Sequence, residues 1–453
     1  MEFVSTRGLA KPLSFSEAVM EGLASDGGLF VPAALPDISG KLDSWQGLGY
    51  SELCFEFLKL FADDIPESDL RGIVERSYKK FDDVSIAPLT KFDDKTWLLE
   101  LYHGPTLAFK DFALQLLGNL YEYLLAKSDR VINVLGATSG DTGSAAINGL
   151  LGKENVNIFI LYPNGRVSPL QQRQMTCTGA SNVFPIAIDG TFDDAQAIVK
   201  ELFGEADFKA KWNLAAVNSI NLARILAQCV YYIYAGLKFP KSQRGLVKYV
   251  VPTGNFGNIL AGWLAYKMGM PARGFCVATN QNDILYRLFK SGVYEVGEVK
   301  PSYAPSMDIQ VSSNFERFIY FMENKDCSKV REIMAAFKSD GKWVFDNFDA
   351  QNFSATKCED LQIAENIARV YKRYGKIIDP HTACGFQDLD GGVNVILSTA
   401  HPAKFPELIE KTVGERPLSP ILEALKEKRI ERICAEASAS EVKKIIESRG
   451  IKK

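Results

Sequence analysis

The sequence has few histidines and no paired cysteines, and these shortages exclude several kinds of metal protein. Only three histidines, His103, His381 and His401, occur among 453 residues, so a histidine-rich metal site is excluded. The eight cysteines are scattered with no C-x-x-C pair, which argues against structural zinc and against a disulfide framework. We therefore expect no bound metal, and a reducing compartment, the cytoplasm.

Long apolar runs and an excess of charge of one sign are also missing. The longest apolar candidate, Ile225–Leu237, is too short to span a membrane and contains Gln228. The formal net charge is −3, so nothing suggests a nucleic-acid footprint. The first residues lack the basic and apolar segments of a signal peptide. We expect neither nucleic-acid nor membrane partners.

Four common catalytic motifs are absent as well. The chain has no G-x-x-x-x-G-K-[ST] phosphate loop and no G-x-G-x-x-G dinucleotide fingerprint. It also lacks G-x-S-x-G and H-E-x-x-H, which argues against a serine hydrolase and against a zinc protease.

From about residue 131, strand-like and helix-like segments alternate. β-branched apolar runs at 131–135, 156–161 and 247–251 are separated by helical patterns such as 220–237. This alternation predicts an α/β protein with mostly parallel sheets covered by helices on both faces. Ligands in such sheets bind at the carboxyl ends of the strands.

The two ends of the chain differ from this pattern. The first hundred residues hold glycine-rich turns such as Asp26–Gly28 and predict a separate N-terminal cap. From about Ser419 the chain is charged with a helical period, which predicts an exposed helical end.

Lys110 stands beside the apolar stripe of a predicted helix. Apolar residues recur with a helical period from Phe109 to Leu124, after the start signals Pro105 and Thr106. A lysine desolvated there would have a lowered pKa and an amine able to attack a carbonyl, such as the aldehyde of pyridoxal phosphate. The alternative is a surface lysine that lies along the helix edge with its charge in solvent.

Two glycine-rich turns each join a predicted strand to a predicted helix. Backbone amides in Thr253–Asn258, next to a helix N-terminus, suit a phosphate, although a tight turn alone explains the glycines equally well. Gly136–Gly143 gathers hydroxyl and carboxyl side chains at another helix start, which suits a carboxylate or a phosphate. Simple helix capping is the alternative there.

Three further polar clusters follow strands or stand near the end of the pattern. Arg166 and Ser168 would suit a second anion, and Arg224 could also bind an anion. The alternative is that each arginine is a surface residue beside a turn, which is common. Thr382 offers a single neutral hydrogen bond.

Taken in order, these segments resemble the threonine synthase family of tryptophan-synthase-β-like pyridoxal-phosphate enzymes. The resemblance covers nearly the whole chain. The motifs that carry it are H-G-P-T-L-A-F-K-D-F (103–112), T-S-G-D-T-G (138–143), T-G-N-F-G-N (253–258) and D-P-H-T-A (379–383), with V-S-T-R-G (4–8), D-G-G-L-F (26–30), G-R-V-S-P (165–169), N-S-I-N (218–221) and S-N-F-E-R (313–317).

The resemblance implies pyridoxal-phosphate fold type II with an N-terminal cap over 1–95. It implies a small α/β domain over 131–239. The large cofactor-binding domain would then comprise 96–130 and 240–453, with a C-terminal helical extension. The implied reaction converts O-phospho-L-homoserine and water to L-threonine and phosphate by γ-elimination and β-hydration, the last step of threonine biosynthesis. A phospho-lyase that releases 2-oxobutanoate, ammonia and phosphate is the alternative, and a non-catalytic module with this fold is a third reading.

The resemblance also implies residue roles. Lys110 would hold pyridoxal phosphate as a Schiff base and move protons. Further cofactor contacts would come from Gly254, Asn255, Phe256, Gly257, Asn258, Thr382 and Asp141. Substrate contacts would come from Thr138, Ser139, Gly140, Thr142, Arg166, Ser168, Asn314 and Arg224. The expected assembly is a monomer or a homodimer.

Overall fold

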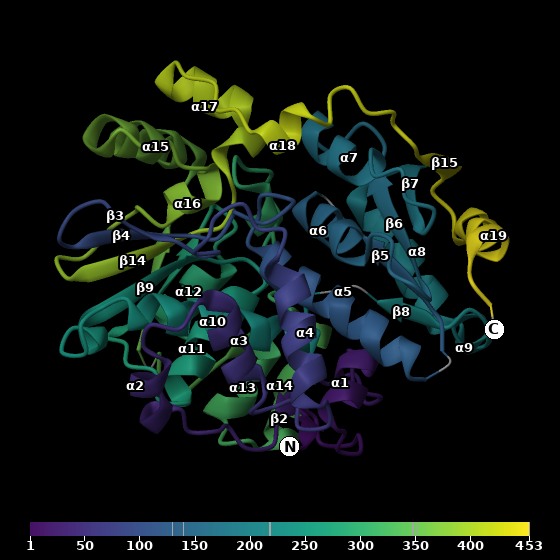
Figure 1. Cartoon of the computed structure of the whole chain (residues 1–453), viewed down its shortest axis with the longest axis horizontal. Helices are drawn as coiled ribbons and strands as arrows, with labels where there is room; N and C mark the ends of the chain where they lie inside the picture. Colours follow the sequence, from purple (N-terminus) through teal and green to yellow (C-terminus); the bar gives the residue numbers. More distant parts are fainter. Residues whose placement is uncertain (129, 139, 217–218, 347, 351, 453) are drawn as a thin grey trace. The chain divides into compact units, whose positions relative to one another are not determined.

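The chain folds into two compact units, each built on its own sheet (Figure 1). The structure, a computed structural model, describes residues 1–128, 130–138, 140–216, 219–346, 348–350 and 352–452. The first unit comprises Met1–Arg71, Phe81–His103 and Ser219–Pro417. The second comprises Gly72–Lys80, Gly104–Asn218 and Leu418–Lys453.

The first unit contains a six-stranded sheet that is parallel except at one edge. Its order is β13 (Phe353–Lys357), β10 (Gly274–Thr279), β9 (Val247–Pro252), β14 (Val393–Ser398), β4 (Thr96–Glu100) and β3 (Leu89–Lys91), and only β3 runs antiparallel to its neighbour.

Helices cover both faces of this sheet, because successive side chains of a strand point to opposite faces. Tyr249 in β9 packs towards α10 (Leu222–Leu237), whereas its neighbour Val250 lies in a core with α15 (Asp360–Tyr374) and α16 (Pro380–Cys384). Helix α11 (Gly257–Lys267) packs beside α10. Figure 1 shows α15 and α16 on the opposite side of the sheet from α10 and α11.

The N-terminal segment packs into this first unit over residues 1–71, whereas a separate cap over 1–95 was expected. Strands β1 (Phe3–Ser5) and β2 (Phe30–Pro32) pair antiparallel. Helix α3 (Tyr50–Leu58) lies against α10, where the rings of Tyr50 and Tyr234 are 5.4 Å apart. Apolar burial on α10 therefore joins the segment to the large sheet.

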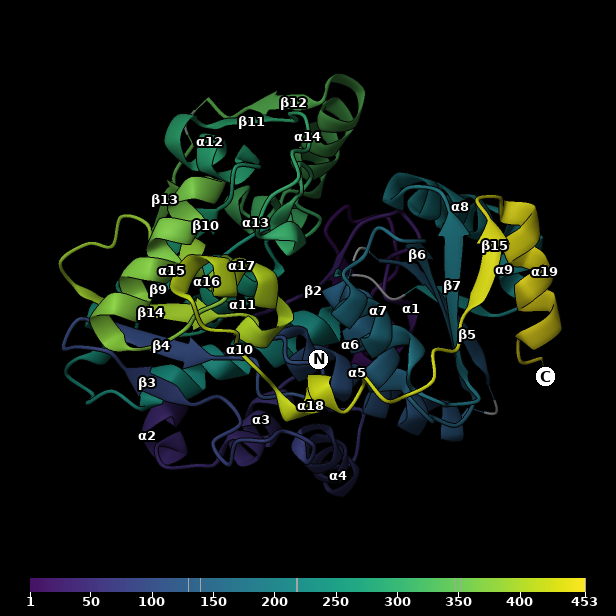
Figure 2. The same ribbon diagram turned by 90° about the horizontal axis from the view of Figure 1, so that it is seen from above.

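The second unit contains a five-stranded parallel sheet. Its order is β15 (Ile433–Glu436), β7 (Val183–Asp189), β6 (Val156–Pro163), β5 (Ile132–Ala137) and β8 (Leu214–Ala216). As Figure 2 shows, one face carries α5 (Lys110–Ala126), α6 (Asp141–Leu150) and α7 (Pro169–Thr176). The other face carries α8 (Phe192–Gly204), α9 (Ala206–Lys211) and α19 (Ala439–Arg449).

The prediction of an exposed helical end was wrong in two respects. Strand β15 adds to the edge of the sheet by pairing with β7, with Ile433 opposite Ile186. Helix α19 is helical as expected, but it buries Val442 and Ile446 completely in the core of the second unit. The tail thus completes the smaller sheet, although it was expected to extend the large domain.

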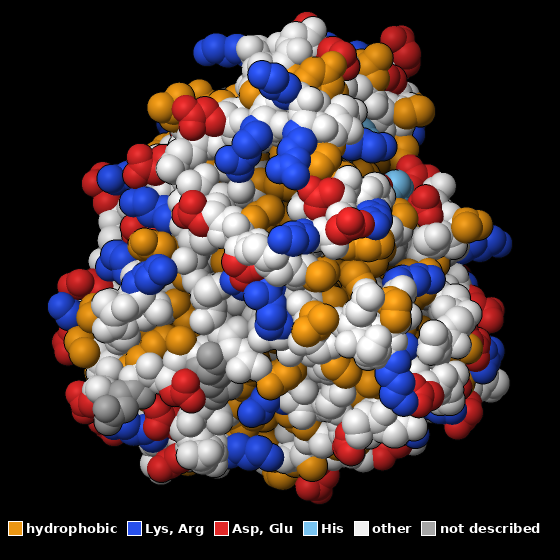
Figure 3. All heavy atoms as spheres, turned by 90° about the vertical axis from the view of Figure 1, so that its left-hand side faces the viewer, with side chains coloured by type: hydrophobic (Ala, Val, Ile, Leu, Met, Phe, Trp, Pro, Cys, Tyr) orange, Lys and Arg blue, Asp and Glu red, His pale blue; other side chains and the backbone are white. Residues whose placement is uncertain are grey.

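No helix among the described residues is long and apolar enough to cross a membrane. On the face of the molecule shown in Figure 3, basic and acidic side chains are interspersed. This mixture agrees with the small net charge.

Candidate active site

The turn between β9 and α11 has the backbone shape of an anion site. Phe256, the residue before the helix, adopts a left-handed conformation with φ of 62°. Its ring is buried, and the centroid of this ring lies 5.4 Å from the ring centroid of Phe315 and 5.4 Å from that of Phe318. Because that conformation is unfavourable for a bulky residue, ring burial must hold it in place. The aromatic core therefore shapes the turn, and only the backbone of Phe256 is available to a ligand there.

The carbonyl groups of this turn point towards one neighbouring segment. The Ser312 hydroxyl donates to the carbonyl of Gly254 at 2.6 Å, and the N–H of Asn314 donates to that of Asn255 at 3.1 Å. In a trans peptide bond, the carbonyl of one residue and the N–H of the following residue point in opposite directions. The N–H groups of Asn255 and Phe256 are therefore turned away from Ser312 and Asn314.

These N–H groups are available to a ligand. Within the part of the chain that the structure describes, no acceptor takes the backbone N–H groups of residues 254–258. Asn258 adds a side-chain donor: its Nδ2 is buried without a hydrogen-bond partner among the described residues. Its Oδ1 meanwhile accepts from the hydroxyls of Tyr231 and Tyr232 at 2.6 and 2.8 Å, which fixes the amide's orientation. Such a set of donors at a helix N-terminus fits the phosphate of pyridoxal phosphate.

Thr382 lies at the same carboxyl edge of the large sheet. Its hydroxyl is 3.0 Å from that of Ser398, the last residue of β14, and donates to Asp379. Asp379 also caps α16 and contacts His381 Nδ1 at 2.9 Å. A hydroxyl has one hydrogen, so while Asp379 takes it Thr382 can only accept from a further group.

His103, which opens the lysine motif, is fixed by two carboxylates of the first unit. Its ring nitrogens lie 2.8 Å from Asp82 and 3.0 Å from Glu100. Burial lowers the pKa of His103, but the hydrogen bonds to Glu100 and Asp82 outweigh burial and leave it raised. This arrangement suits a structural histidine at the end of the strand.

In the second unit, Lys110 is the first residue of α5 and is half-buried. The turn before it is closed by Asp111, whose carboxylate accepts from the N–H and the hydroxyl of Thr106 at 2.8 and 2.6 Å. Gly104 is required there, since a Cβ would lie 2.5 Å from the Asp111 side chain. The predicted helix is confirmed, and its start presents Lys110 from a rigid turn.

Helices α5 and α6 run parallel and in direct backbone contact. Gly118 and Gly149 allow this approach, because a Cβ on Gly118 would lie 1.9 Å from the Gly149 carbonyl. The Gln115 amide donates a hydrogen bond to the Asn148 side chain, and further along the chain the Lys153 ammonium donates to Glu122. Residue numbers therefore increase in the same direction along both segments. The starts of both helices therefore lie at one end, which brings Lys110 to the same side as the 138–143 turn.

The 138–143 turn is organised by Thr138. Its hydroxyl oxygen accepts from the N–H groups of Gly140 and Gly143 at 3.0 and 2.9 Å. Gly140 has φ of 155° and would place a Cβ 2.5 Å from the Gln171 side chain. Thr142 is half-buried at the first turn of α6. The expected site residue Ser139 lies outside the described residues.

Gln171, which the sequence did not single out, joins two predicted sites. Its Nε2 donates to Asp141 at 3.1 Å, and its Oε1 accepts from the Ser168 hydroxyl at 3.1 Å. Ser168 also caps α7 by accepting from the Gln171 N–H. Arg166, two residues earlier, is exposed. The structure thus connects Asp141 with Ser168, and leaves the Arg166 guanidinium accessible.

Asn314 and Arg224 belong to the first unit and are both buried. Asn314 donates to the carbonyl of Ser219 at 3.1 Å and accepts from Arg317 at 2.6 Å, so its amide is engaged within the unit. Arg224 lies in the first turn of α10.

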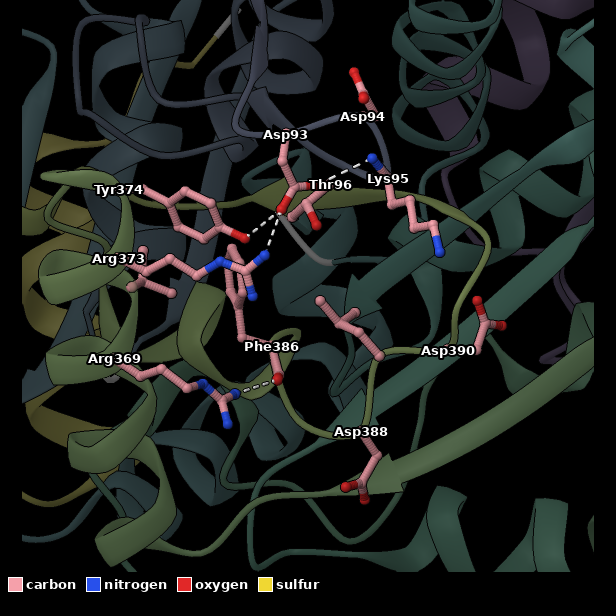
Figure 4. A pocket seen from close by; sticks show the side chains of 12 residues that line it. Asp93, Asp94, Lys95, Thr96, Arg369, Arg373, Tyr374, Phe386, Asp388 and Asp390 are labelled. Atoms are coloured by element: carbon pink, nitrogen blue, oxygen red, sulfur yellow. Dashed lines mark hydrogen bonds and ion pairs between the residues drawn. The ribbon is translucent and has the colours of Figure 1, made fainter.

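A cavity of about 640 Å³ in the first unit is not the predicted site (Figure 4). It is lined by residues at the starts of β4 and β14, such as Thr96 and Asp390, and hence lies at the amino edge of the sheet. Ligands of parallel sheets bind at the opposite edge. Several of its charged groups are already paired: Asp93 accepts from Tyr374 at 2.7 Å, and Arg369 donates to the Phe386 carbonyl at 2.7 Å.

Three family profiles cover most of the chain. They are described as threonine synthase N terminus (residues 2–78), pyridoxal-phosphate dependent enzyme (85–393) and threonine synthase, C-terminal (382–446).

Individual relatives agree with these profiles. A threonine synthase of Pseudomonas aeruginosa is 46% identical, with 93% of this chain and 92% of the relative covered. A solved pyridoxal-phosphate-bound threonine synthase of Brucella melitensis is 40% identical and superposes with a TM-score of 0.96 over 99% of both chains. The threonine synthase-like 2 protein of Xenopus laevis is 34% identical, with 91% and 90% covered. The chain therefore belongs to the threonine synthase family of pyridoxal-phosphate-dependent enzymes.

Proposed function

We propose that the protein converts O-phospho-L-homoserine and water to L-threonine and phosphate, with the residue roles given below. The observation that carries the proposal is the joining of three polar helix starts in the second unit. Gln171 links the start of α6 to that of α7, and Gln174 donates to the Thr106 carbonyl at 3.0 Å in the turn before Lys110. An amine, a carboxylate-binding turn and an anion-binding helix start suit a substrate with a carboxylate at one end and a phosphate at the other.

The cofactor roles rest on the first unit and on Lys110. The N–H groups of residues 254–258 and the Asn258 amide would bind the cofactor phosphate, and Thr382 would face the pyridine nitrogen. Asp141 is also proposed to lie near the cofactor. The hydrogen bond that it accepts from Gln171 would fix its carboxylate there. When bound to Lys110, pyridoxal phosphate supplies an electron sink for charge that develops on the substrate.

The substrate roles rest on the turn at the start of α6. Gly140 and Thr142, with Ser139, would bind the α-carboxylate, while Thr138 shapes the turn that presents these groups. Arg166 and Ser168 are proposed for the substrate phosphate, and Asn314 and Arg224 remain further candidates.

Lys110 would act as the general base and general acid. Its Nζ, released when the substrate amine binds, would take a proton from the α carbon and then from the β carbon. Phosphate would leave from the γ carbon, and Nζ would then deliver a proton to the γ carbon, which becomes the methyl group. The hydroxyl of water would add at the β carbon, and Nζ would return a proton to the α carbon. The turn closed by Asp111 would fix the backbone from which the Lys110 side chain reaches the substrate in these transfers.

We also propose that the protein is cytoplasmic and is a monomer or a homodimer. The scattered cysteines, all eight of which are free thiols, support a reducing compartment.

Product analysis tests the reaction directly. We expect one threonine for each phosphate released from O-phospho-L-homoserine, because hydration competes successfully with release of the unsaturated intermediate. Phosphate release alone does not discriminate, since a phospho-lyase also eliminates phosphate. Equal amounts of 2-oxobutanoate and ammonia, without threonine, would establish the phospho-lyase reading.

Arg166→Ala tests the substrate-phosphate role. A charged hydrogen bond to the phosphate dianion contributes roughly 1.5–3 kcal/mol, so we expect kcat/KM to fall about tenfold or more. Visible absorbance of the bound cofactor should be unchanged. Arg449→Ala is the matched control, an exposed arginine of the same unit whose carbonyl contacts Asn157 near the start of β6, at the opposite edge of the sheet. Equal kinetics in both variants would make Arg166 a surface residue.

A further inference from the structure

The turn of residues 254–258 is held by a short segment, Ser312–Asn314, that is distant from it in sequence. Beyond the two contacts to the carbonyls of Gly254 and Asn255, the Ser313 hydroxyl donates to the Asn255 side chain at 3.1 Å. The Asn314 Nδ2 lies near the Asn255 carbonyl, at 3.3 Å. These bonds fix the carbonyls on one side and thereby turn the following N–H groups to the other. The position of Ser312–Asn314 therefore determines the direction of the anion-binding donors.

Arg317 fixes Ser312–Asn314 from behind. Its side chain is completely buried in α13 (Phe315–Met322), and each of its three nitrogens donates a hydrogen bond. Nε donates to the Phe30 carbonyl at 3.0 Å, one amino group to Asn314 Oδ1 at 2.6 Å, and the other to the Ile220 carbonyl at 2.6 Å. The rigid guanidinium fork thus orients the Asn314 amide.

The charge of Arg317 has no carboxylate in contact with it among the described residues. Its neighbour Glu316 is directed elsewhere, towards the guanidinium of Arg7 at 2.9 Å and the hydroxyl of Thr6 at 2.6 Å. Burial lowers the pKa of Arg317 to about 9, although the nearby Glu316 carboxylate acts in the opposite direction. A buried cation whose hydrogen bonds all go to neutral oxygens remains costly, and a further anion nearby would stabilise it.

A phosphate at the 254–258 turn would supply that anion. Asn314 is the link, because its Nδ2 lies 3.1 Å from where a Cβ of Gly257, the first residue of α11, would stand. The guanidinium is therefore one side chain away from the helix start whose N–H groups point at the phosphate. Resting on the proposed role of that turn, we propose that Arg317 is the positioning residue of the cofactor-phosphate site. It acts through Asn314, by aligning the turn and by placing a positive charge behind it.

The test compares the binding of pyridoxal phosphate with that of pyridoxal, which lacks the phosphate. Dissociation constants are measured from visible absorbance on cofactor-free protein, for the wild type and for Arg317→Met. We expect the preference for pyridoxal phosphate over pyridoxal to fall about tenfold or more, the loss of one charge-assisted hydrogen bond. Affinity for pyridoxal should stay the same, because pyridoxal makes no use of the phosphate site.

Arg244→Met is the matched control. Arg244 is also buried in the first unit and also donates to neutral oxygens, the Phe239 carbonyl at 3.3 Å and the Gln46 amide at 3.1 Å. The Arg244→Met substitution should lower thermal stability without changing the preference for pyridoxal phosphate over pyridoxal.

If Arg317→Met does not fold, Asn314→Ala removes the next group in the same chain of contacts. It should reduce the preference for pyridoxal phosphate to a similar extent.

Three outcomes are distinguishable. A reduced preference in Arg317→Met, or in Asn314→Ala where Arg317→Met does not fold, with pyridoxal affinity retained, supports the inference. A wild-type preference in folded Arg317→Met, or equal losses for the two compounds, shows that Arg317 only stabilises the fold and overturns it. If the wild type itself shows no preference, the proposed phosphate role of residues 254–258 fails, and the inference fails with it.

Discussion

Lys110→Ala should lower kcat by at least about a thousandfold, because in the proposed mechanism it removes both the covalent attachment of the cofactor and the proton-transferring amine. The purified variant should also lose the visible absorbance expected of a cofactor bound to Lys110. Lys127→Ala, at the other end of α5, is the matched control and should retain both properties. Thermal denaturation should confirm that the two variants are folded.

Chemical trapping checks the same assignment independently. Borohydride reduction of the wild type, followed by peptide mapping, should place the cofactor adduct on Lys110. An adduct on a different lysine would show that Lys110 is not the cofactor-binding lysine, whatever the activity of the alanine variant. The half-buried position of Lys110 behind a closed turn favours it over a solvated lysine on a helix edge.

Local signals in the sequence were enough to predict the elements that carry the site. The helical period beside Lys110 became α5, and the apolar runs at 156–161 and 247–251 became β6 and β9. The glycine-rich turns appeared where a strand ends and a helix begins, since φ values and close approaches at those points restrict the residue type. Such features depend on neighbours a few residues away and are therefore visible in one sequence.

The contacts that shape the proposed binding turns were not predictable in the same way. Asn258 is oriented by Tyr231 and Tyr232, which the sequence shows only as part of an apolar helical run. Arg317 donates to Phe30, which is separated from it by 287 positions. Which polar residue meets which carbonyl is decided by tertiary packing, and no periodicity records it.

The tail shows how a periodic signal misleads. The charged, helical pattern after Ser419 is real in α19, but the short strand β15 before it has only four residues. An edge strand of that length carries too few alternations to stand out from its surroundings. Strands β4 and β14 were not predicted either, although the run at β14 is rich in β-branched residues and offered a signal.

Gly254→Val should raise the dissociation constant of pyridoxal phosphate roughly a hundredfold or more, which corresponds to losing two charge-assisted hydrogen bonds. A Cβ at this position would stand 3.0 Å from the Ile309 side chain, and 3.2 and 3.3 Å from backbone atoms of Met307 and Ser306. The side chain of Ile309 can turn away, but backbone atoms yield less easily than a side chain. We therefore expect the turn to shift and its N–H groups to lose their alignment with the proposed phosphate.

The control for this substitution is Gly245→Val, because a Cβ on Gly245 would meet no atom within 4 Å. It should leave cofactor affinity unchanged in an equilibrium titration followed by visible absorbance. Affinity for pyridoxal, which lacks the phosphate, should change far less in Gly254→Val than affinity for pyridoxal phosphate. Normal binding of pyridoxal phosphate by Gly254→Val would count against the proposed phosphate role of the N–H groups of this turn.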